Sequence, residues 1–247
     1  FDDTDRASGD VAITESSTAK TVVGLKSWQT QGASPTESFI AQAGTKLYRD
    51  SSGTWSDITG ALTLTDANTN LMSCAVLNNI LCCANRSRNA LFKDTGSGNG
   101  AVLAGSPIAG RYLISFDRRL WDFGGSANPL LGYFSNRDDP EIWDATNQFV
   151  NLDKGSGVEV TGVALLGQDI ILVFKGGAGE SILAIERTGT ALGYQVYVFA
   201  EGIGCPSHQT ISYLPGGHPI WVGFDDVYAA LGTRIESMGK HPKTGKP

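Results

Sequence analysis

Residues 163–174 read VALLGQDIILVF, two short apolar runs separated by a turn of three residues. Pairs of runs joined across one to three residues recur along the chain and begin near residues 39, 72, 112, 163 and 211. Their spacing is about 33 to 50 residues, and a period of roughly 40 to 50 residues is typical of β-propellers built from four-stranded blades. This repeat predicts the fold class before any single side chain is considered.

The remaining sequence supplies short β-prone runs between turn residues. No window of eleven or more residues keeps the 3.6-residue period of an amphipathic helix. The run Ile170–Phe174 is apolar at every position, as expected for a strand that is covered on both faces. We therefore expect an all-β fold, a β-propeller of about five four-stranded blades that is either incomplete or part of a larger chain. The expected divisions are an extended arm at 1–20, the propeller at 21–239 and an exposed tail at 240–247.

The charge balance bears on possible partners. The 247 residues carry 19 basic and 25 acidic side chains, a formal net charge of −6. Affinity for nucleic acids arises when lysine and arginine neutralise phosphates, so this balance argues against a protein that wraps DNA or RNA. Charged residues make up only 18% of the chain, which suggests that partners cover part of its surface.

The four cysteines, Cys74, Cys82, Cys83 and Cys205, include no CxxC pair. Adjacent Cys82 and Cys83 are expected to point to opposite faces of a strand, so they do not easily serve one tetrahedral metal site. We expect buried free thiols that pack as small apolar side chains. A Cys74–Cys82 bridge between neighbouring strands is the alternative.

No motif predicts a catalytic, cofactor or metal site. His208 and His218 lie in neither an HExxH nor an HxH pattern. The glycine-rich stretch 176–181 lacks the lysine of a phosphate-binding loop, and we expect it to be a hairpin turn. The carboxylate pairs at 138–139 and 225–226 lack the DxDxDG pattern of calcium loops. The sequence therefore predicts neither an enzyme nor a bound cofactor.

The segment from about residue 118 to residue 239 carries a set of motifs that belong together. They are RLW at 119–121, GGSANP at 124–129, YFSN at 133–136, DDPEIW at 138–143, ILVFK at 171–175, GIGC at 202–205 and WVGFDDVY at 221–228. This block resembles the structural β-propeller proteins of tailed-bacteriophage tails, of the nozzle or tail-tube-extension type. The N-terminal blades join the resemblance only through GTKLYRDSSGTWSDIT at 44–59. Asp226 departs from the family pattern, which usually has glycine there.

The resemblance implies a virion structural protein that assembles as a ring, a hexamer, around the DNA exit channel of the tail. Its implied partners are copies of itself, adjacent tail or adaptor proteins, and viral DNA that passes through the lumen without specific binding. We expect no membrane insertion. An acidic inner wall would help the DNA to pass, because it repels phosphates.

Loops of the third strand group are expected to supply contacts between subunits, since connecting segments carry much of the recognition in rigid folds. This group is expected to end at Ser135 and to continue into a long loop through Asn136-Arg137-Asp138-Asp139-Pro140. The predicted interaction residues are Asn128, Pro129, Asn136, Arg137, Asp138, Asp139 and Trp143.

Two other functions are compatible with a propeller. A carbohydrate-binding propeller that recognises host-surface glycans would need the same aromatic and polar pair in several blades, and no such pair recurs in the sequence. A sialidase-like hydrolase would need convergent arginines from different blades, whereas Arg111, Arg118, Arg119 and Arg137 all fall in one.

Overall fold

The computed structural model of the protein describes residues 14–15, 18–31, 35–51, 53–67, 69, 71–87, 90–177, 179–189 and 193–239. Within these residues the regular structure consists of strands β1 to β23 and the 3-10 turn η2 (His208–Thr210). The tail predicted at 240–247 and most of the arm predicted at 1–20 lie outside the described residues. Inside the arm, β1 (Thr14–Glu15) and β2 (Thr18–Ala19) form an antiparallel pair.

Strands β3 to β23 form five antiparallel sheets that follow one another in chain order. Sheet 1 contains β3 (Val22–Gln29), β4 (Glu37–Ala43), β5 (Lys46–Ser51) and β6 (Thr54–Asp57). Sheet 2 contains β7 (Met72–Leu77), β8 (Ile80–Asn85), β9 (Phe92–Asp94) and β10 (Ala101–Val102). Sheet 3 contains β11 (Tyr112–Phe116), β12 (Arg119–Phe123), β13 (Leu131–Asn136), β14 (Asp139–Trp143) and β15 (Phe149–Asn151). Sheet 4 contains β16 (Glu159–Leu166), β17 (Ile170–Gly176), β18 (Ser181–Arg187) and β19 (Tyr194–Glu201), and sheet 5 contains β20 (Ser212–Leu214), β21 (His218–Val222), β22 (Val227–Leu231) and β23 (Arg234–Ser237).

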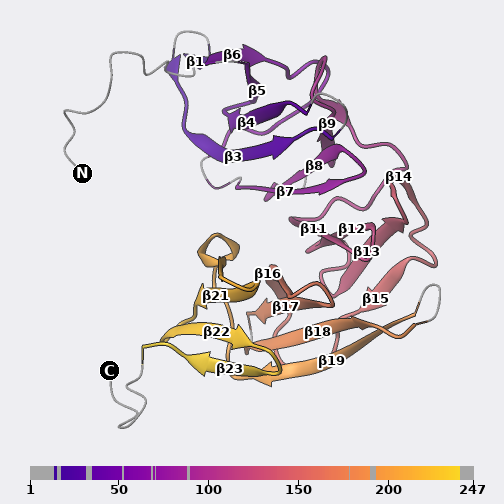
Figure 1. The fold of residues 1–247 in the computed structure, drawn as a ribbon, viewed down its shortest axis with the longest axis vertical. Coiled ribbons are helices and arrows are strands. Elements are labelled where there is room, and N and C mark those ends of the chain that lie inside the picture. Colours follow the sequence, from indigo (N-terminus) through magenta and orange to yellow (C-terminus); the bar gives the residue numbers. More distant parts are fainter. Residues whose placement is uncertain are drawn as a thin grey trace.

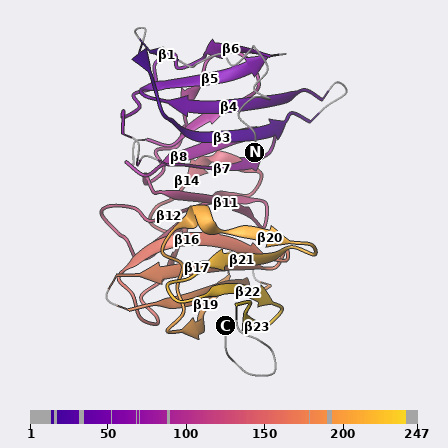
Figure 2. The same cartoon turned by 90° about the vertical axis from the view of Figure 1, so that its left-hand side faces the viewer.

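The five sheets stand around an arc (Figure 1). Strands β3, β7, β11 and β16, each the first of its sheet, lie on the inner side, and each contacts the next along the arc. Sheets 1 and 5 stand at the two ends of the arc, and Figure 2 looks onto the open side between them. The prediction of an all-β chain with five successive strand groups is confirmed: four sheets have four strands, and sheet 3 has a fifth, β15.

Apolar side chains fill the space between successive sheets. The run in strand β17 is apolar throughout because its alternate residues pack in two different cores. Ile171 and Val173 pack toward sheet 3, while Leu172 and Phe174 pack toward sheet 5, and all four are 0% exposed. Burying one such side chain contributes about 1.5 to 3 kcal/mol. The expectation that this strand is covered on both faces is confirmed.

Hydrogen bonds also join the inner strands of neighbouring sheets. An inner strand is the edge of its sheet, so half of its backbone N–H groups face no partner strand. Side chains from the adjacent sheet accept several of these donors, which satisfies them without a continuous ladder. Three inner-strand N–H groups donate in this way: Leu113 to Ser73 Oγ (3.1 Å), Val163 to His208 Nδ1 (3.4 Å) and Leu165 to Tyr213 Oη (2.9 Å). Beyond the end of β3, the Gln31 N–H donates to Asn79 Oδ1 in the β7–β8 turn at 2.6 Å.

The separations of bonded residues show the repeat directly. The four hydrogen bonds join residues 48, 40, 45 and 48 positions apart. Ion pairs between sheets keep the same interval, with 45 for Arg49–Asp94, 48 for Lys93–Glu141 and 48 for Arg111–Glu159. Equivalent positions in successive sheets therefore bind one another, as a repeat of roughly 40 to 50 residues requires.

The long loop predicted through residues 136–140 is wrong. Strands β13 and β14 are joined by a tight turn at Arg137-Asp138, and Asp138 adopts a φ of 58°. The Asp138 N–H donates to the carbonyl of Arg118 at 2.6 Å, which fixes this turn. Pro140 lies within β14, which is possible because β14 is an outer strand with one edge free of ladder hydrogen bonds.

The alternative Cys74–Cys82 bridge is also wrong. In the hairpin of β7 and β8, Cys74 lies opposite Cys83, and Cys82 lies opposite Ala75. Cys82 and Cys83 point to opposite faces, since they belong to different cores, as expected. All four cysteines are free thiols in the structure, and Cys82, Cys83 and Cys205 are buried.

Candidate functional site

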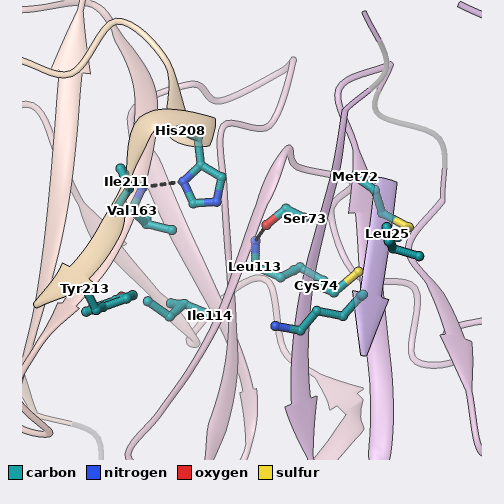
Figure 3. A pocket seen from close by; sticks show the side chains of 11 residues that line it. Leu25, Met72, Ser73, Cys74, Leu113, Ile114, Val163, His208, Ile211 and Tyr213 are labelled. Atoms are coloured by element: carbon teal, nitrogen blue, oxygen red, sulfur yellow. Dashed lines mark hydrogen bonds between the residues drawn. The ribbon is translucent and has the colours of Figure 1, made fainter. Parts of the chain in front are cut away.

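A cavity of about 300 Å³ lies on the inner side of the arc and is lined by residues from all five sheets and from the 3-10 turn (Figure 3). It is called the central hollow below. Its lining residues are Leu25, Lys26, Met72, Ser73, Cys74, Leu113, Ile114, Val163, His208, Ile211 and Tyr213. This site could not be predicted from the sequence, because its residues come from five separate repeats and share no motif.

The polar groups of the central hollow mostly serve packing. Ser73, His208 and Tyr213 accept the inter-sheet hydrogen bonds described above, and Figure 3 shows the bond to His208. Burial lowers the pKa of His208 to about 4 and raises the pKa of Tyr213, so both side chains are neutral at pH 7. The lining includes the ammonium group of Lys26 and no carboxylate. The hollow thus offers a mixed wall of apolar and uncharged polar side chains with one cation. The lumen of a ring of copies is a different surface, so the acidic wall stays a prediction.

We expect a His208→Asn variant to lose less stability than the unaltered protein when the pH falls from 7 to 4. Asparagine Oδ1 can accept the Val163 N–H but does not titrate. The pKa of His208 is about 4 in the folded chain, against an ordinary value of 6.5. The unfolded state therefore binds the proton first, and stability is lost as the pH falls from 6.5 through 4. The difference is at most about 3 kcal/mol. Urea unfolding at several pH values measures it, and parallel curves for the two proteins would contradict it.

A charged cluster around Asp117 joins the ends of sheets 3 and 4. The Asp117 carboxylate accepts hydrogen bonds from Arg137 at 2.7 Å and from the Tyr194 hydroxyl at 2.8 Å, and Arg187 lies 3.4 Å away. Burial alone would raise the pKa of Asp117, but the bonds from Tyr194 and Arg137 outweigh it and lower that pKa. These arginines are therefore paired with a carboxylate of the protein itself and do not form an open site for an anionic sugar.

The structure separates the predicted interaction residues into two places. Asn128 and Pro129 lie in the β12–β13 connection, whereas Asn136, Arg137, Asp138, Asp139 and Trp143 lie at the other end of β13 and along β14. Several are engaged within the chain. Asp138 forms an ion pair with Arg118, the Trp143 Nε1–H donates to Pro140 at 2.7 Å, and the Asn128 amide donates to the Tyr133 hydroxyl at 3.0 Å. Their part in contacts between subunits stays a prediction.

Two tryptophans of the motif block at 118–239, Trp121 and Trp221, lie in the cores. The Trp121 Nε1–H donates to the carbonyl of Phe116 at 3.2 Å, and the Trp221 Nε1–H donates to the carbonyl of Gly204 at 3.1 Å. Their exposed fractions are 0% and 1%. A buried indole needs such a partner for its N–H. These two motif positions therefore serve packing.

Asp226, the departure from the family pattern, has a structural task of its own. Its carboxylate accepts the N–H of Val227 at 2.7 Å and the N–H of Gly239 at 3.1 Å, and it also accepts the Ser237 hydroxyl. These bonds tie the start of β22 to the end of β23. Its backbone has no positive φ, so the position does not demand glycine.

Among the described residues, no group of three or more histidine, cysteine, aspartate and glutamate side chains could hold a metal ion. No helix in that part of the chain is long and apolar enough to cross a membrane.

The outer face of sheet 5, defined by Leu214, Ile220, Val222, Val227 and Leu231, has no covering element among the described residues. Alternate residues of the same strands point the other way and pack against sheet 4. All five are half-buried or exposed, and Val222 is 46% exposed. A β-sheet with two apolar faces is stable when both are covered. This face therefore presents a group of apolar side chains, beside Ser212, His218, Arg234 and Glu236, that no described element covers.

The outer face of sheet 1, defined by Leu25, Phe39 and Trp55, is the second surface with no covering element among the described residues. The strand register places Phe39 in line with Trp55, and Leu25 lies on the same face, which also carries the polar Ser27 and Asp50. Leu25 is 62% exposed and Phe39 is 38% exposed. The opposite side of the same sheet carries the residues that pack on sheet 2. Both ends of the arc thus present apolar side chains. The sequence predicts these strands, but it does not show that one of their faces has no neighbour.

No protein-family model and no curated protein matches the chain. Among solved structures, it is similar to one chain in the crystal structure of a nidogen/laminin complex, with 12% identity and a TM-score of 0.50, covering 79% of this chain and 75% of that chain. It also matches extracellular domains of a hybrid two-component system and of a one-component system from B. thetaiotaomicron. Identities are 10% and 12%, both TM-scores are 0.40, coverage of this chain is 92% and 94%, and each match covers 34% of the other chain. The first likeness supports a propeller-like arrangement of sheets, and the other two are too distant to add to it.

Proposed function

We propose that the protein is a structural subunit of a bacteriophage tail that assembles with copies of itself into a closed ring. The observation that carries this proposal is the pair of uncovered apolar faces at the two ends of the arc. Faces between neighbouring sheets inside the chain form cores of buried side chains. The two outer faces carry apolar side chains among polar ones, and neither has a neighbouring sheet among the described residues.

The two faces consist of different residues. We therefore expect the outer face of sheet 1 in one copy to contact the outer face of sheet 5 in the next copy. Contacts between unlike surfaces are head to tail, and they generate rings when the rotation closes. Each apolar Å² removed from water contributes about 25 cal/mol, so covering both faces favours the assembled form. The repeat of sheets inside one chain thereby continues from one chain into the next.

The assignment to a phage tail rests on the resemblance of residues 118–239. Two of its tryptophans lie in cores, which suits a component of a rigid particle. The net charge of −6 disfavours retention of DNA, as a channel for a moving genome requires. The proposed partners are copies of the chain, adjacent tail or adaptor proteins and passing DNA. Gold-labelled antibody against the chain should bind the tails of phage particles from the same source, and labelling of heads alone or of no particle would contradict the assignment.

A charge on the outer face of sheet 5 is expected to weaken self-association more than tenfold. In the Val222→Asp variant a carboxylate would be buried unpaired at the proposed contact, which costs several kcal/mol, whereas tenfold in affinity is only about 1.4 kcal/mol. Val222 is 46% exposed in the single chain, so the variant should still fold. Sedimentation equilibrium over a range of concentrations measures the change.

The matched control is Val102→Asp on the outermost strand of sheet 2. Val102 is 52% exposed, and its strand is not at an end of the arc. This variant should associate like the unaltered protein. Equal weakening by both substitutions, or a monomer at all concentrations before any substitution, would contradict the proposed contact.

A further inference from the structure

Two of the three cysteines in sheet 2 face each other across a hairpin. Cys74 of β7 and Cys83 of β8 are directly opposite in the register, and their sulfur atoms lie 2.8 Å apart. That separation is shorter than the usual contact between two carbon atoms, about 3.5 to 4 Å. Cys82 points to the other side of the sheet and packs in a different core. The hairpin therefore selects one cysteine pair out of three.

The backbone at this pair suits a disulfide. The Arg86 N–H donates to the Leu71 carbonyl at 3.2 Å, which marks the pair 71–86 as hydrogen-bonded. Hydrogen-bonded and non-hydrogen-bonded pairs alternate along an antiparallel ladder, so 74–83 is a non-hydrogen-bonded pair. The Cα atoms of such pairs are about 4.5 Å apart, and disulfides span Cα separations of about 4.4 to 6.8 Å. A bridge fits here without movement of the strands.

The two sulfur atoms differ in their access to solvent. Cys74 is half-buried and lines the central hollow, where Figure 3 shows its side chain. Cys83 is 1% exposed and lies beneath it, and burial raises the pKa of its thiol well above the usual range. A small reagent that enters the hollow therefore meets Cys74 first, and Cys83 can react only with a partner already held beside it.

We propose that Cys74 and Cys83 form a reversible intrachain disulfide when the protein meets a small-molecule disulfide such as oxidised glutathione. The Cys74 thiolate attacks one glutathione sulfur, the glutathione S–S bond breaks, and one glutathione thiolate leaves and takes up a proton. The Cys83 sulfur then attacks the Cys74 sulfur of the mixed disulfide and loses its own proton to water. The second glutathione leaves as a thiol. Two protein thiols are oxidised and one glutathione disulfide is reduced to two thiols.

The position of Cys74 also predicts that the bridge is easily reduced. Its sulfur lies half-buried in the central hollow, where a thiol can reach it, and exposed disulfides are more reducible than buried ones. The pair is thus expected to respond to the thiol–disulfide balance of its surroundings and not to be a permanent staple. This inference is independent of the proposed assembly, because it rests on one hairpin of a single chain.

The test is a count of free thiols in denatured protein after incubation of the folded protein with oxidised glutathione. The count should fall from four to two, and reduced glutathione should restore it. Non-reducing gels should show no dimer linked by a disulfide. An unchanged count, or a ladder of linked chains, would overturn the proposal.

Single substitutions identify the pair. Cys82→Ala should still lose two thiols, from three to one, since Cys82 lies outside the pair. Cys74→Ser should lose no thiol. Cys83 then has no partner for a bridge, and the burial of its sulfur prevents a lasting mixed disulfide with glutathione. Loss of two thiols in Cys74→Ser, or none in Cys82→Ala, would overturn the assignment. Cys74 is half-buried, so the serine variant should fold, and a thermal unfolding curve checks this.

Discussion

Replacing Trp121 with alanine is expected to lower the free energy of unfolding by about 3 to 5 kcal/mol, the usual cost of truncating a buried tryptophan. Trp121 is 0% exposed and lies in the core between sheets 3 and 4. Its ring centroid is 4.6 Å from that of Phe134 and 4.7 Å from that of Tyr194 in the adjacent sheet. Truncation removes contacts on both sides and leaves a cavity, because the neighbouring strands are held in their ladders.

Equilibrium urea unfolding of the unaltered protein, Trp121→Ala and Trp121→Phe measures this effect. The phenylalanine variant keeps a ring in the core but loses the hydrogen bond to the carbonyl of Phe116. It should therefore lose less than half of what the alanine variant loses. A loss below about 1 kcal/mol in Trp121→Ala, within the range of ordinary surface changes, would show that the contact between sheets 3 and 4 is not a tightly packed core.

Replacing Gly105 with alanine should also be strongly destabilising, with a loss of about 2 to 5 kcal/mol from backbone strain and overlap together. Gly105 has a φ of +78°, in the left-handed region that residues with a Cβ rarely adopt. A Cβ there would also lie 2.2 Å from the Glu141 carbonyl oxygen, which belongs to β14 of the next sheet. The connection between sheets 2 and 3 would have to move away from that strand.

Gly98→Ala provides the matched control. Its φ of +64° is also left-handed, but a Cβ there would meet nothing within 4 Å. It should lose only the cost of the left-handed conformation, about 1 to 2 kcal/mol. Thermal and urea unfolding of both variants separate strain from overlap. Equal losses at the two positions would mean that the connection does not approach Glu141 as the structure shows.

Much of the fold could be predicted because the repeat is local. An apolar run such as Ile170–Phe174 indicates a strand that is covered on both faces. A turn such as Gly167–Asp169 indicates where the chain reverses direction. Strand grouping follows from these two signals. The β14 strand escaped prediction because Pro140 and two aspartates resemble a loop, and only the outer position of β14 in the sheet makes a proline acceptable there.

The sites were harder to predict because they join residues from different repeats. The register that places Cys74 opposite Cys83 depends on a two-residue turn at Asn78-Asn79, and moving the register by one would have paired Cys74 with Cys82. The central hollow has no sequence motif at all. The strands that form the outer faces of sheets 1 and 5 could be predicted from their apolar residues. Only the structure shows that these sheets stand at the ends of the arc, where no described element covers their outer faces.

Cryo-electron microscopy of the purified chain tests the central claim most directly, since it shows both the copy number and the contact surfaces. We expect closed rings in which the outer face of sheet 5 in each copy packs against the outer face of sheet 1 in the next. Single copies with both faces exposed, or single copies in which sheet 5 closes onto sheet 1 of the same chain, would contradict assembly through these faces.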